Sequence, residues 1–171
     1  MEIAKKGGTV HLVCRNPKFA EEAQKEIQDV SNNSNIYVHI LDMSDPKAVR
    51  SFAEGFSEPL NVLINNAGCM VNQRTLTEDG FEKNFATNTL GTHVLTENLI
   101  PNLLKTSSDE KPRVVIVSSG EIFSSVLYFK VIDSGQSRQD LKFEITIFLI
   151  KVNSFFEGHN GFNEITILLS I

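Results

Sequence analysis

The stretch L-N-V-L-I-N-N-A-G, residues 60–68, decides how the rest of this chain is interpreted. An apolar run with β-branched members is followed by two carboxamides and Ala-Gly, a pattern typical of a buried strand that opens into a tight loop. A strand buried on both faces belongs to a parallel α/β sheet. Ligands of such sheets bind at the carboxyl ends of the strands, so we expect residues 65–68 to lie at a ligand site, with Gly68 allowing close backbone approach. Taken alone, these four residues favour the simpler alternative of a strand that ends in a polar turn.

The composition indicates a soluble globular protein. The chain has 171 residues, of which 41% are hydrophobic and 22% charged, so it can bury a sizeable core. The net charge of -5 argues against a nucleic-acid partner or an anionic membrane, because no basic stripe is present to neutralise phosphates. Met1–Gly8 does not have the pattern of a signal peptide, and no apolar run reaches the ~18 residues of a membrane span. We therefore expect a cytoplasmic protein by default.

Neither the cysteines nor the histidines have the spacing of metal ligands. Cys14 and Cys69 lack a C-x-x-C partner and suit a reducing compartment as two unpaired thiols. The four histidines are scattered along the chain, at His11, His39, His93 and His159. We expect no metal site from this pattern.

Strand and helix patterns alternate up to about residue 120. Strands are predicted at Thr9–Arg15, Ile36–Leu41, Leu60–Asn65 and Arg113–Val117. Four helices are expected. The first ends before Gly7-Gly8, and the third starts at Ser44-Asp45-Pro46. The second is capped by Asn16 and has an apolar face made of Phe19, Ala23, Ile27 and Val30. The fourth is long, is capped by Thr77, and carries Phe81, Phe85, Leu90, Val94, Leu95, Leu99 and Leu103. This alternation predicts right-handed crossovers and a doubly wound parallel sheet.

Residues 121–171 differ in character from residues 1–120. They hold seven of the twelve phenylalanines and have no long helical pattern. Lys142–Val152 and Glu164–Ile171 are low in charge and resemble strands. We expect a domain over 1–120 followed by an irregular, strand-like tail.

Four short motifs occur in order along the first region: Leu41-Asp42, N-N-A-G at 65–68, N-x-x-G at Asn88–Gly91, and V-S-S-G at 117–120. In this order and spacing the chain resembles the short-chain dehydrogenase/reductase family. The resemblance implies a Rossmann-like sheet and an NADP(H)-dependent oxidoreductase that acts on a small carbonyl or alcohol substrate.

The resemblance also implies a cofactor site at the strand ends. Asp42 would accept a hydrogen bond from the adenine amino group, and the backbone of Asn65, Ala67 and Gly68 would line the adenosine ribose. Arg15 occupies the place where such enzymes put a cation against a 2′-phosphate. NADP(H) is therefore favoured over NAD(H), because an acidic residue there would bind the free ribose hydroxyls.

The catalytic residues implied by the resemblance are incomplete. Asn88 would hold a water in the proton relay, and Ser119 would hydrogen-bond the substrate carbonyl. The family's Y-x-x-x-K pair is absent: Tyr128 is followed by Lys130 at i+2, which points to nearly the opposite face of a helix, and by Ile132 at i+4. We therefore expect this chain to be catalytically incompetent.

Family members begin with a strand and a glycine-rich T-G-x-x-x-G-x-G loop, whereas this sequence starts inside the following helix. That loop brings backbone N–H groups to the pyrophosphate. Losing three or four charge-assisted hydrogen bonds of ~1.5–3 kcal/mol each would turn micromolar binding into millimolar or weaker binding. We expect cofactor binding by this chain to be weak or absent.

The same difference leaves the predicted sheet without its first strand. In the family that strand lies between those predicted at Thr9–Arg15 and Leu60–Asn65, so its absence leaves a gap of about 10 Å. Unpaired backbone groups beside a buried gap are unfavourable. Either the two strands pair directly, or Lys142–Val152 or Glu164–Ile171 is inserted between them.

Two classes of function remain open for the chain itself. One is an oxidoreductase, and the other is a shortened, non-catalytic form that acts through a partner or has no function. A flavodoxin-like nucleotide module is a third possibility, but it would need a phosphate loop after the first strand, and residues 15–19 contain no glycine. The missing glycine loop and Tyr/Lys pair favour the non-catalytic form.

Overall fold

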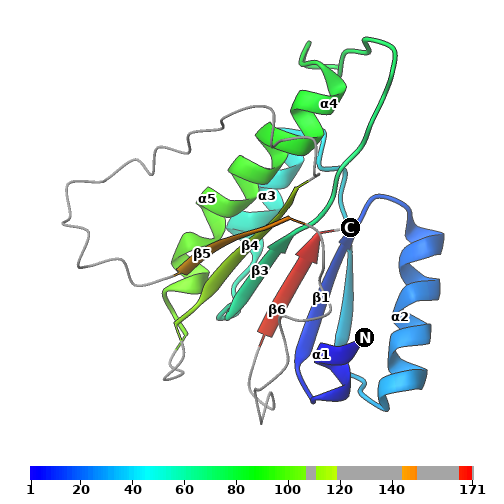
Figure 1. Ribbon diagram of the computed structural model, residues 1–171, viewed down its shortest axis with the longest axis vertical. Helices are drawn as coiled ribbons and strands as arrows, with labels where there is room; N and C mark the ends of the chain where they lie inside the picture. Colours follow the sequence, from blue (N-terminus) through cyan, green and yellow to red (C-terminus); the bar gives the residue numbers. More distant parts are fainter. Residues whose placement is uncertain (107–110, 119–143, 150–165, 171) are drawn as a thin grey trace.

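The computed structural model describes residues 1–106, 111–118, 144–149 and 166–170, which build a parallel sheet with helices on both faces (Figure 1). Its strands are β1 (Thr9–Cys14), β2 (Ile36–Ile40), β3 (Val62–Asn65), β4 (Arg113–Ser118), β5 (Glu144–Leu149) and β6 (Thr166–Ser170). The described helices are α1 (Glu2–Lys5), α2 (Pro17–Ser31), α3 (Pro46–Gly55), α4 (Lys83–Phe85), the π-helix η1 (Ala86–Gly91) and α5 (Thr92–Leu103). The predicted fold class, a partial doubly wound parallel sheet, is confirmed.

Strand β1 divides its side chains between two cores. Leu12 packs with Ala20 of α2 on one face of the sheet, and Val13 packs with Val49 of α3 and Leu95 of α5 on the other. This alternation follows from the two-residue period of a strand. Each fully buried Leu or Val contributes about 1.5–3 kcal/mol of transfer free energy. The helices are thus held on both sides of the sheet by apolar burial.

The gap beside β1 is filled by β6. The strand order is β2-β1-β6-β3-β4-β5, and Leu168 of β6 is in register with His11 of β1 and Leu63 of β3. The predicted insertion of Glu164–Ile171 is therefore confirmed, and Lys142–Val152 instead supplies β5 at the edge beside β4. Parallel ladders on both sides of β6 satisfy backbone groups that a gap would leave unpaired. Strands from regions 1–120 and 121–171 consequently share one sheet.

The predicted apolar face of α2 is wrong at both ends. Phe19 is 66% exposed and Val30 is 50% exposed, while Ala20 is buried and Ile27 packs against the core. The inward stripe includes Gln24, because its amide donates to the Ile36 carbonyl of β2 at 2.6 Å. The inward face of α2 therefore includes a polar side chain that hydrogen-bonds the edge strand, which a pattern of hydrophobic residues cannot predict.

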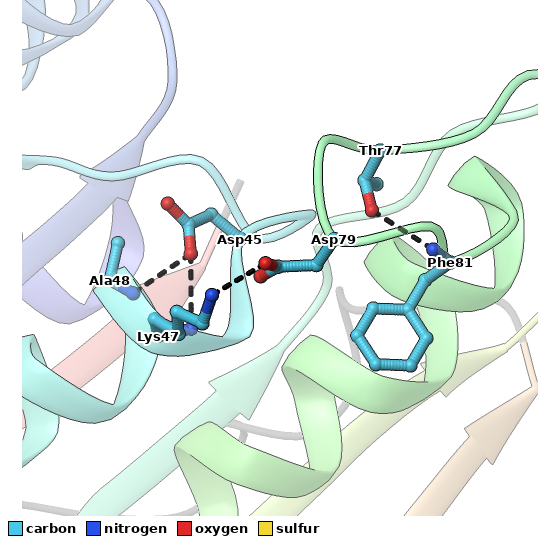
Figure 2. Close-up of polar contacts among 6 residues, drawn as sticks. All are labelled: Asp45, Lys47, Ala48, Thr77, Asp79 and Phe81. Atoms are coloured by element: carbon cyan, nitrogen blue, oxygen red, sulfur yellow. Dashed lines mark hydrogen bonds and ion pairs between the residues drawn. The ribbon is translucent and has the colours of Figure 1, made fainter.

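Two predicted helix starts are confirmed by their side-chain caps. The Asn16 side chain accepts a hydrogen bond from the Phe19 N–H at the start of α2. The Asp45 carboxylate accepts from the N–H groups of Lys47 and Ala48, each at 3.0 Å, at the start of α3 (Figure 2). Both bonds satisfy donors that the first turn of a helix leaves without partners.

The predicted start of the long helix at Thr77 is wrong. Gly80, whose φ is 82°, donates its N–H to the Thr77 carbonyl, so Thr77 closes a turn. The helix begins after Glu82, whose carboxylate accepts from the N–H groups of Asn84 and Phe85. A left-handed residue cannot continue a right-handed helix, so Gly80 separates Thr77 from α4.

The helical segment that follows is interrupted by a wider turn. It runs through α4, η1 and α5, and π turns of this kind occur as local insertions in α-helices. Its buried residues include the predicted Val94, Leu95, Leu99 and Leu103. Phe81 and Phe85, which were placed on the same face, are 38% and 49% exposed, so that part of the prediction is wrong.

Cys14 and Cys69 are free thiols, as predicted. Burial raises the pKa of the Cys14 thiol. Within the described ranges, no three or more His, Cys, Asp or Glu side chains group to hold a metal ion. None of the helices in those ranges has the length and apolar character needed to cross a bilayer.

Candidate functional site

Asn65 lies at the carboxyl end of β3 and is buried. Its Nδ2 donates to the Thr96 hydroxyl of α5 at 2.9 Å, whereas its Oδ1 has no hydrogen-bond partner among the described residues. A buried carbonyl oxygen without a partner costs about 1–3 kcal/mol. The strand end therefore holds an unused acceptor beside the loop 66–68. No sequence signal pointed to Thr96, because its contact with Asn65 depends on how α5 packs on the sheet.

Asn88 holds the backbone that follows Gly68. Its Oδ1 accepts from the Cys69 N–H at 2.8 Å, and its Nδ2 donates to the Cys69 carbonyl at 2.9 Å. A Cβ on Gly68 would meet Asn88 Oδ1 at 3.5 Å, an ordinary contact. The side chain expected to hold a water is thus engaged with the loop, and its part in a proton relay stays a prediction.

A second asparagine, Asn84, extends this arrangement. It accepts from the Val71 N–H at 2.8 Å and donates to the Val71 carbonyl at 2.9 Å. The amides of Asn84 and Asn88 therefore replace the ladder hydrogen bonds that a loop lacks, and they fix its path from Cys69 to Val71. Sequence reasoning missed Asn84; its spacing of four residues from Asn88, one turn along the helix, is the signal that could have identified it.

Gly91 allows η1 to approach the loop that carries Asp42. A Cβ on Gly91 would lie 2.1 Å from the Met43 carbonyl oxygen, so no side chain fits there. In that loop, Asp42 Oδ1 accepts from both the N–H and the hydroxyl of Ser44 at 2.8 Å. The N-x-x-G pattern singled out Gly91 without giving it this role. Its effect is to bring the end of β2 next to the helix that holds Asn88.

The predicted cofactor residues follow strands whose carboxyl ends share one edge. Arg15 is exposed after β1, and Asp42 is partly buried after β2. These strands are direct neighbours, since the Leu41 N–H donates to the Cys14 carbonyl at 2.9 Å. Asn65 is the last residue of β3, and β6 separates β3 from β1. The edge therefore presents one cation, one carboxylate and a carboxamide loop.

An ion pair joins α3 to the turn before α4. The Lys47 ammonium contacts the Asp79 carboxylate, and Figure 2 shows this contact beside the Asp45 cap and the Thr77 hydroxyl, which accepts from the Phe81 N–H. Lys47 is 79% exposed, so the pair contributes little stability. It does fix the side of the turn that faces α3.

The remaining catalytic positions lie outside the described residues. Ser119 follows β4 directly, and Tyr128 and Lys130 are in the same undescribed range. Their predicted roles therefore stay predictions.

The fold and the polar strand ends define a doubly wound α/β protein with a candidate ligand site at the carboxyl edge of its sheet. A family model described as short chain dehydrogenase matches residues 1–130, and the chain belongs to this family. It is 63% identical over 122 residues to dehydrogenase/reductase SDR family member 12 of Bos taurus and 60% identical to that of Homo sapiens. Each match covers 70% of this chain but 38% of the relative, so the chain spans well under half of their length.

Solved structures show the same fold. A crystal structure of a protein from Mycobacterium paratuberculosis has a TM-score of 0.57 and 40% identity, and the match covers 70% of this chain and 40% of that one. A short-chain dehydrogenase from Sphingobium yanoikuyae, solved in complex with NADPH, has a TM-score of 0.57 at 20% identity and covers 72% of this chain and 48% of its own.

Proposed function

We propose that this chain retains the adenosine end of a family NADP(H) site and does not by itself reduce a carbonyl. The observation that carries the proposal is the shared carboxyl edge of β1, β2 and β3, which presents Arg15, Asp42 and the loop 65–68. Structures of related dehydrogenases hold NADPH or NADP+. The family reaction, hydride transfer between a nicotinamide cofactor and a small carbonyl or alcohol substrate, is proposed for longer relatives of this chain.

Each of these residues has a role in the proposal. The Arg15 guanidinium binds the 2′-phosphate through two parallel N–H groups, which distinguishes NADP(H) from NAD(H). The Asp42 carboxylate accepts a hydrogen bond from the adenine amino group through Oδ2, the oxygen that Ser44 does not use. The backbone of Asn65, Ala67 and Gly68 lines the ribose.

The pyrophosphate and nicotinamide halves have no matching residues in this proposal. A glycine-rich loop that would present backbone N–H groups to the diphosphate is absent from the sequence, and β6 occupies the position between β1 and β3. Asn88 and Ser119 are the proposed remnants of the catalytic set, but no Tyr/Lys pair is spaced to transfer the proton. In this proposal the described residues bind the adenosine end of the nucleotide and do not make up a full catalytic set.

Titration with NADPH, NADH and adenosine 2′,5′-bisphosphate tests the proposal. We expect NADPH to bind with a dissociation constant of about a millimolar or weaker, since several charge-assisted bonds are missing. The bisphosphate should bind about as tightly as NADPH, and NADH more weakly than either. Amide NMR shifts should change near residues 15, 42 and 65–68.

The matched pair Arg15→Ala and Lys18→Ala separates a phosphate contact from general charge, because both residues are exposed and lie close in sequence. Only Arg15→Ala should abolish the preference for NADPH over NADH. Micromolar binding of NADPH would contradict the missing pyrophosphate site. Absence of any shift at 10 mM bisphosphate, about ten times the expected constant, would contradict a retained adenosine end.

A further inference from the structure

Two histidines that are far apart in sequence meet on one face of the sheet. His11 of β1 pairs across the ladder with Tyr37, so His39 lies diagonally opposite on β2. His11 Nδ1 and His39 Nε2 are 2.9 Å apart, and the opposite nitrogen of His11, Nε2, lies 3.3 Å from Glu58 in the α3–β3 connection. Because Glu58 contacts the far side of the His11 ring, the three groups form a chain rather than a common metal site.

The cluster His11–His39–Glu58 is enclosed by aromatic rings. Phe56, at the end of α3, lies T-shaped against His11 with ring centres 5.1 Å apart, and Phe52 of α3 is tilted against His39 at the same distance. His11 is 2% exposed, whereas Glu58 is 54% exposed. The end of α3 therefore shields His11 from water, and Glu58 is the member of the cluster that contacts solvent.

One arrangement of protons satisfies the neutral cluster. A lone pair on His11 Nε2 would repel the Glu58 carboxylate, so we assign the proton to Nε2, where it faces Glu58 across 3.3 Å without a full hydrogen bond. His11 Nδ1 then accepts from the N–H of His39 Nε2. The Nδ1 of half-buried His39 is left to bind one further proton, with the Glu58 charge nearby.

A second added proton has no comparable place. It would have to bind His11 Nδ1, and two N–H groups would then face each other across 2.9 Å between two cations. The cluster can take up this second proton only if His39 swings out, which breaks the contact and uncovers His11 and the two phenylalanines. The ladder hydrogen bonds hold the strands themselves in place, so the movable part is the side-chain layer and the end of α3.

We propose that the His11–His39–Glu58 cluster is a pH-sensitive latch, which holds the end of α3 against β1 and β2 while it carries at most one added proton and opens when it takes a second. Burial lowers the pKa of both histidines, and the Glu58 charge raises both against that effect. Among the described residues, the Tyr37 phenol is a further titratable group against the cluster, and its ring stacks on His11. The segment of β6 beside His11, T-I-L-L-S, contains no titratable side chain.

Hydrogen exchange of the full chain between pH 7.5 and 5 tests the latch. After correction for intrinsic exchange rates, the opening constant of residues 52–58 should rise as the pH falls below ~6.5, because the open cluster binds two added protons and the closed cluster at most one. The rise should be steeper than tenfold per pH unit until the closed cluster binds its first proton, and about tenfold per unit below that pH. His11→Gln should leave a rise of at most tenfold per unit. Glu58→Gln should extend the steeper part of the rise to lower pH, because the closed cluster then binds its first proton less readily.

His93→Gln is the matched control, since His93 also contacts a carboxylate, Glu97 at 3.4 Å, but is 64% exposed. It should behave as the wild type. Imidazole ¹⁵N spectra of the wild type give a readout that does not depend on variants: His39 should gain the first proton while His11 keeps its Nε2–H tautomer. Titration of His11 near pH 6.5 without a change in exchange at 52–58 would overturn the proposal. So would a Glu58→Gln chain with the wild-type slope.

Discussion

Gly91 determines how closely η1 approaches the loop after β2. Gly91→Ala would place a methyl group 2.1 Å from the Met43 carbonyl oxygen and 3.2 Å from the Ala86 carbonyl oxygen. Both oxygens belong to the backbone, so neither can move aside as a flexible side chain would. We expect a loss of about 2–4 kcal/mol in the free energy of unfolding, because the helix and the loop must move apart. Denaturant unfolding monitored by circular dichroism measures it.

Gly55→Ala is the matched control for that substitution. Gly55 ends α3, and nothing lies within 4 Å of the position its Cβ would occupy. This variant should be neutral or stabilised by up to about 1 kcal/mol, since alanine has the better helix propensity. Equal destabilisation by the two substitutions would show that the approach to Met43 is not the cause.

Asn102 is a buried side chain whose part the sequence did not indicate. Its Nδ2 donates to the carbonyls of Phe56 at 2.7 Å and Glu58 at 2.9 Å. Asn102→Ala leaves both carbonyls without this donor and should cost about 2–4 kcal/mol, which a thermal melt would record as a fall of roughly 4–16 °C in Tm.

Asn98→Ala provides the comparison on the same helix. Among the described residues, Asn98 donates only to the Val94 carbonyl of its own helix, at 2.8 Å, so its removal should cost well under 1 kcal/mol. The contrast tests whether Asn102 stabilises the chain through the α3–β3 connection. A similar Tm for the two variants would refute this.

At the level of elements, β6 is the strand on which the sheet depends for continuity between β1 and β3. Leu168→Pro removes a backbone donor from a strand that is paired on both sides and should destabilise the chain by about 3 kcal/mol or more. Leu168→Ala keeps the donor and serves as the control for the side chain. Denaturant midpoints that are equal for the two variants would mean that the β6 ladders contribute nothing.

For the whole molecule, His11 and His39 make stability depend on pH. Burial lowers both pKa values in the folded chain, while an unfolded histidine binds its proton near pH 6.5. Unfolding therefore takes up protons below that pH. The contribution of the two neutral histidines to the free energy of unfolding is fully present above pH ~6.5. It is lost as the pH falls through the folded pKa values, by up to about 1.4 kcal/mol per pH unit for each histidine. Urea unfolding at pH 7.5, 6.5 and 5.5 measures the loss, which His93→Gln should leave unchanged.

The whole chain is also expected to lack catalytic activity. With NADPH at millimolar concentration and a small aldehyde or ketone, oxidation of NADPH should stay at the background rate, because no side chain is spaced to supply the proton. Absorbance at the nicotinamide band follows the reaction. Turnover that is lost in Tyr128→Phe would show that the i+2 spacing to Lys130 is no barrier.

The sequence by itself predicted the alternating elements and most of their limits. The strand predicted at Thr9–Arg15 is found at Thr9–Cys14. Like the caps Asn16 and Asp45 and the buried Leu95 and Leu99, it follows from local signals: hydrophobic period, capping side chains and turn residues. The motifs also placed the candidate site at the carboxyl edge. These features depend on residues that are close together in the chain, so they can be predicted from the sequence pattern alone.

Only the tertiary structure decided what depends on distant partners. Two apolar stretches fitted the gap, and their similar patterns could not show that Thr166–Ser170 pairs with β1 and β3 while Glu144–Leu149 takes the edge. The meeting of His11, His39 and Glu58 likewise has no linear signal. It follows from the register of β1 against β2 and from the packing of α3, because contacts between sequence-distant residues are set by how whole elements pack.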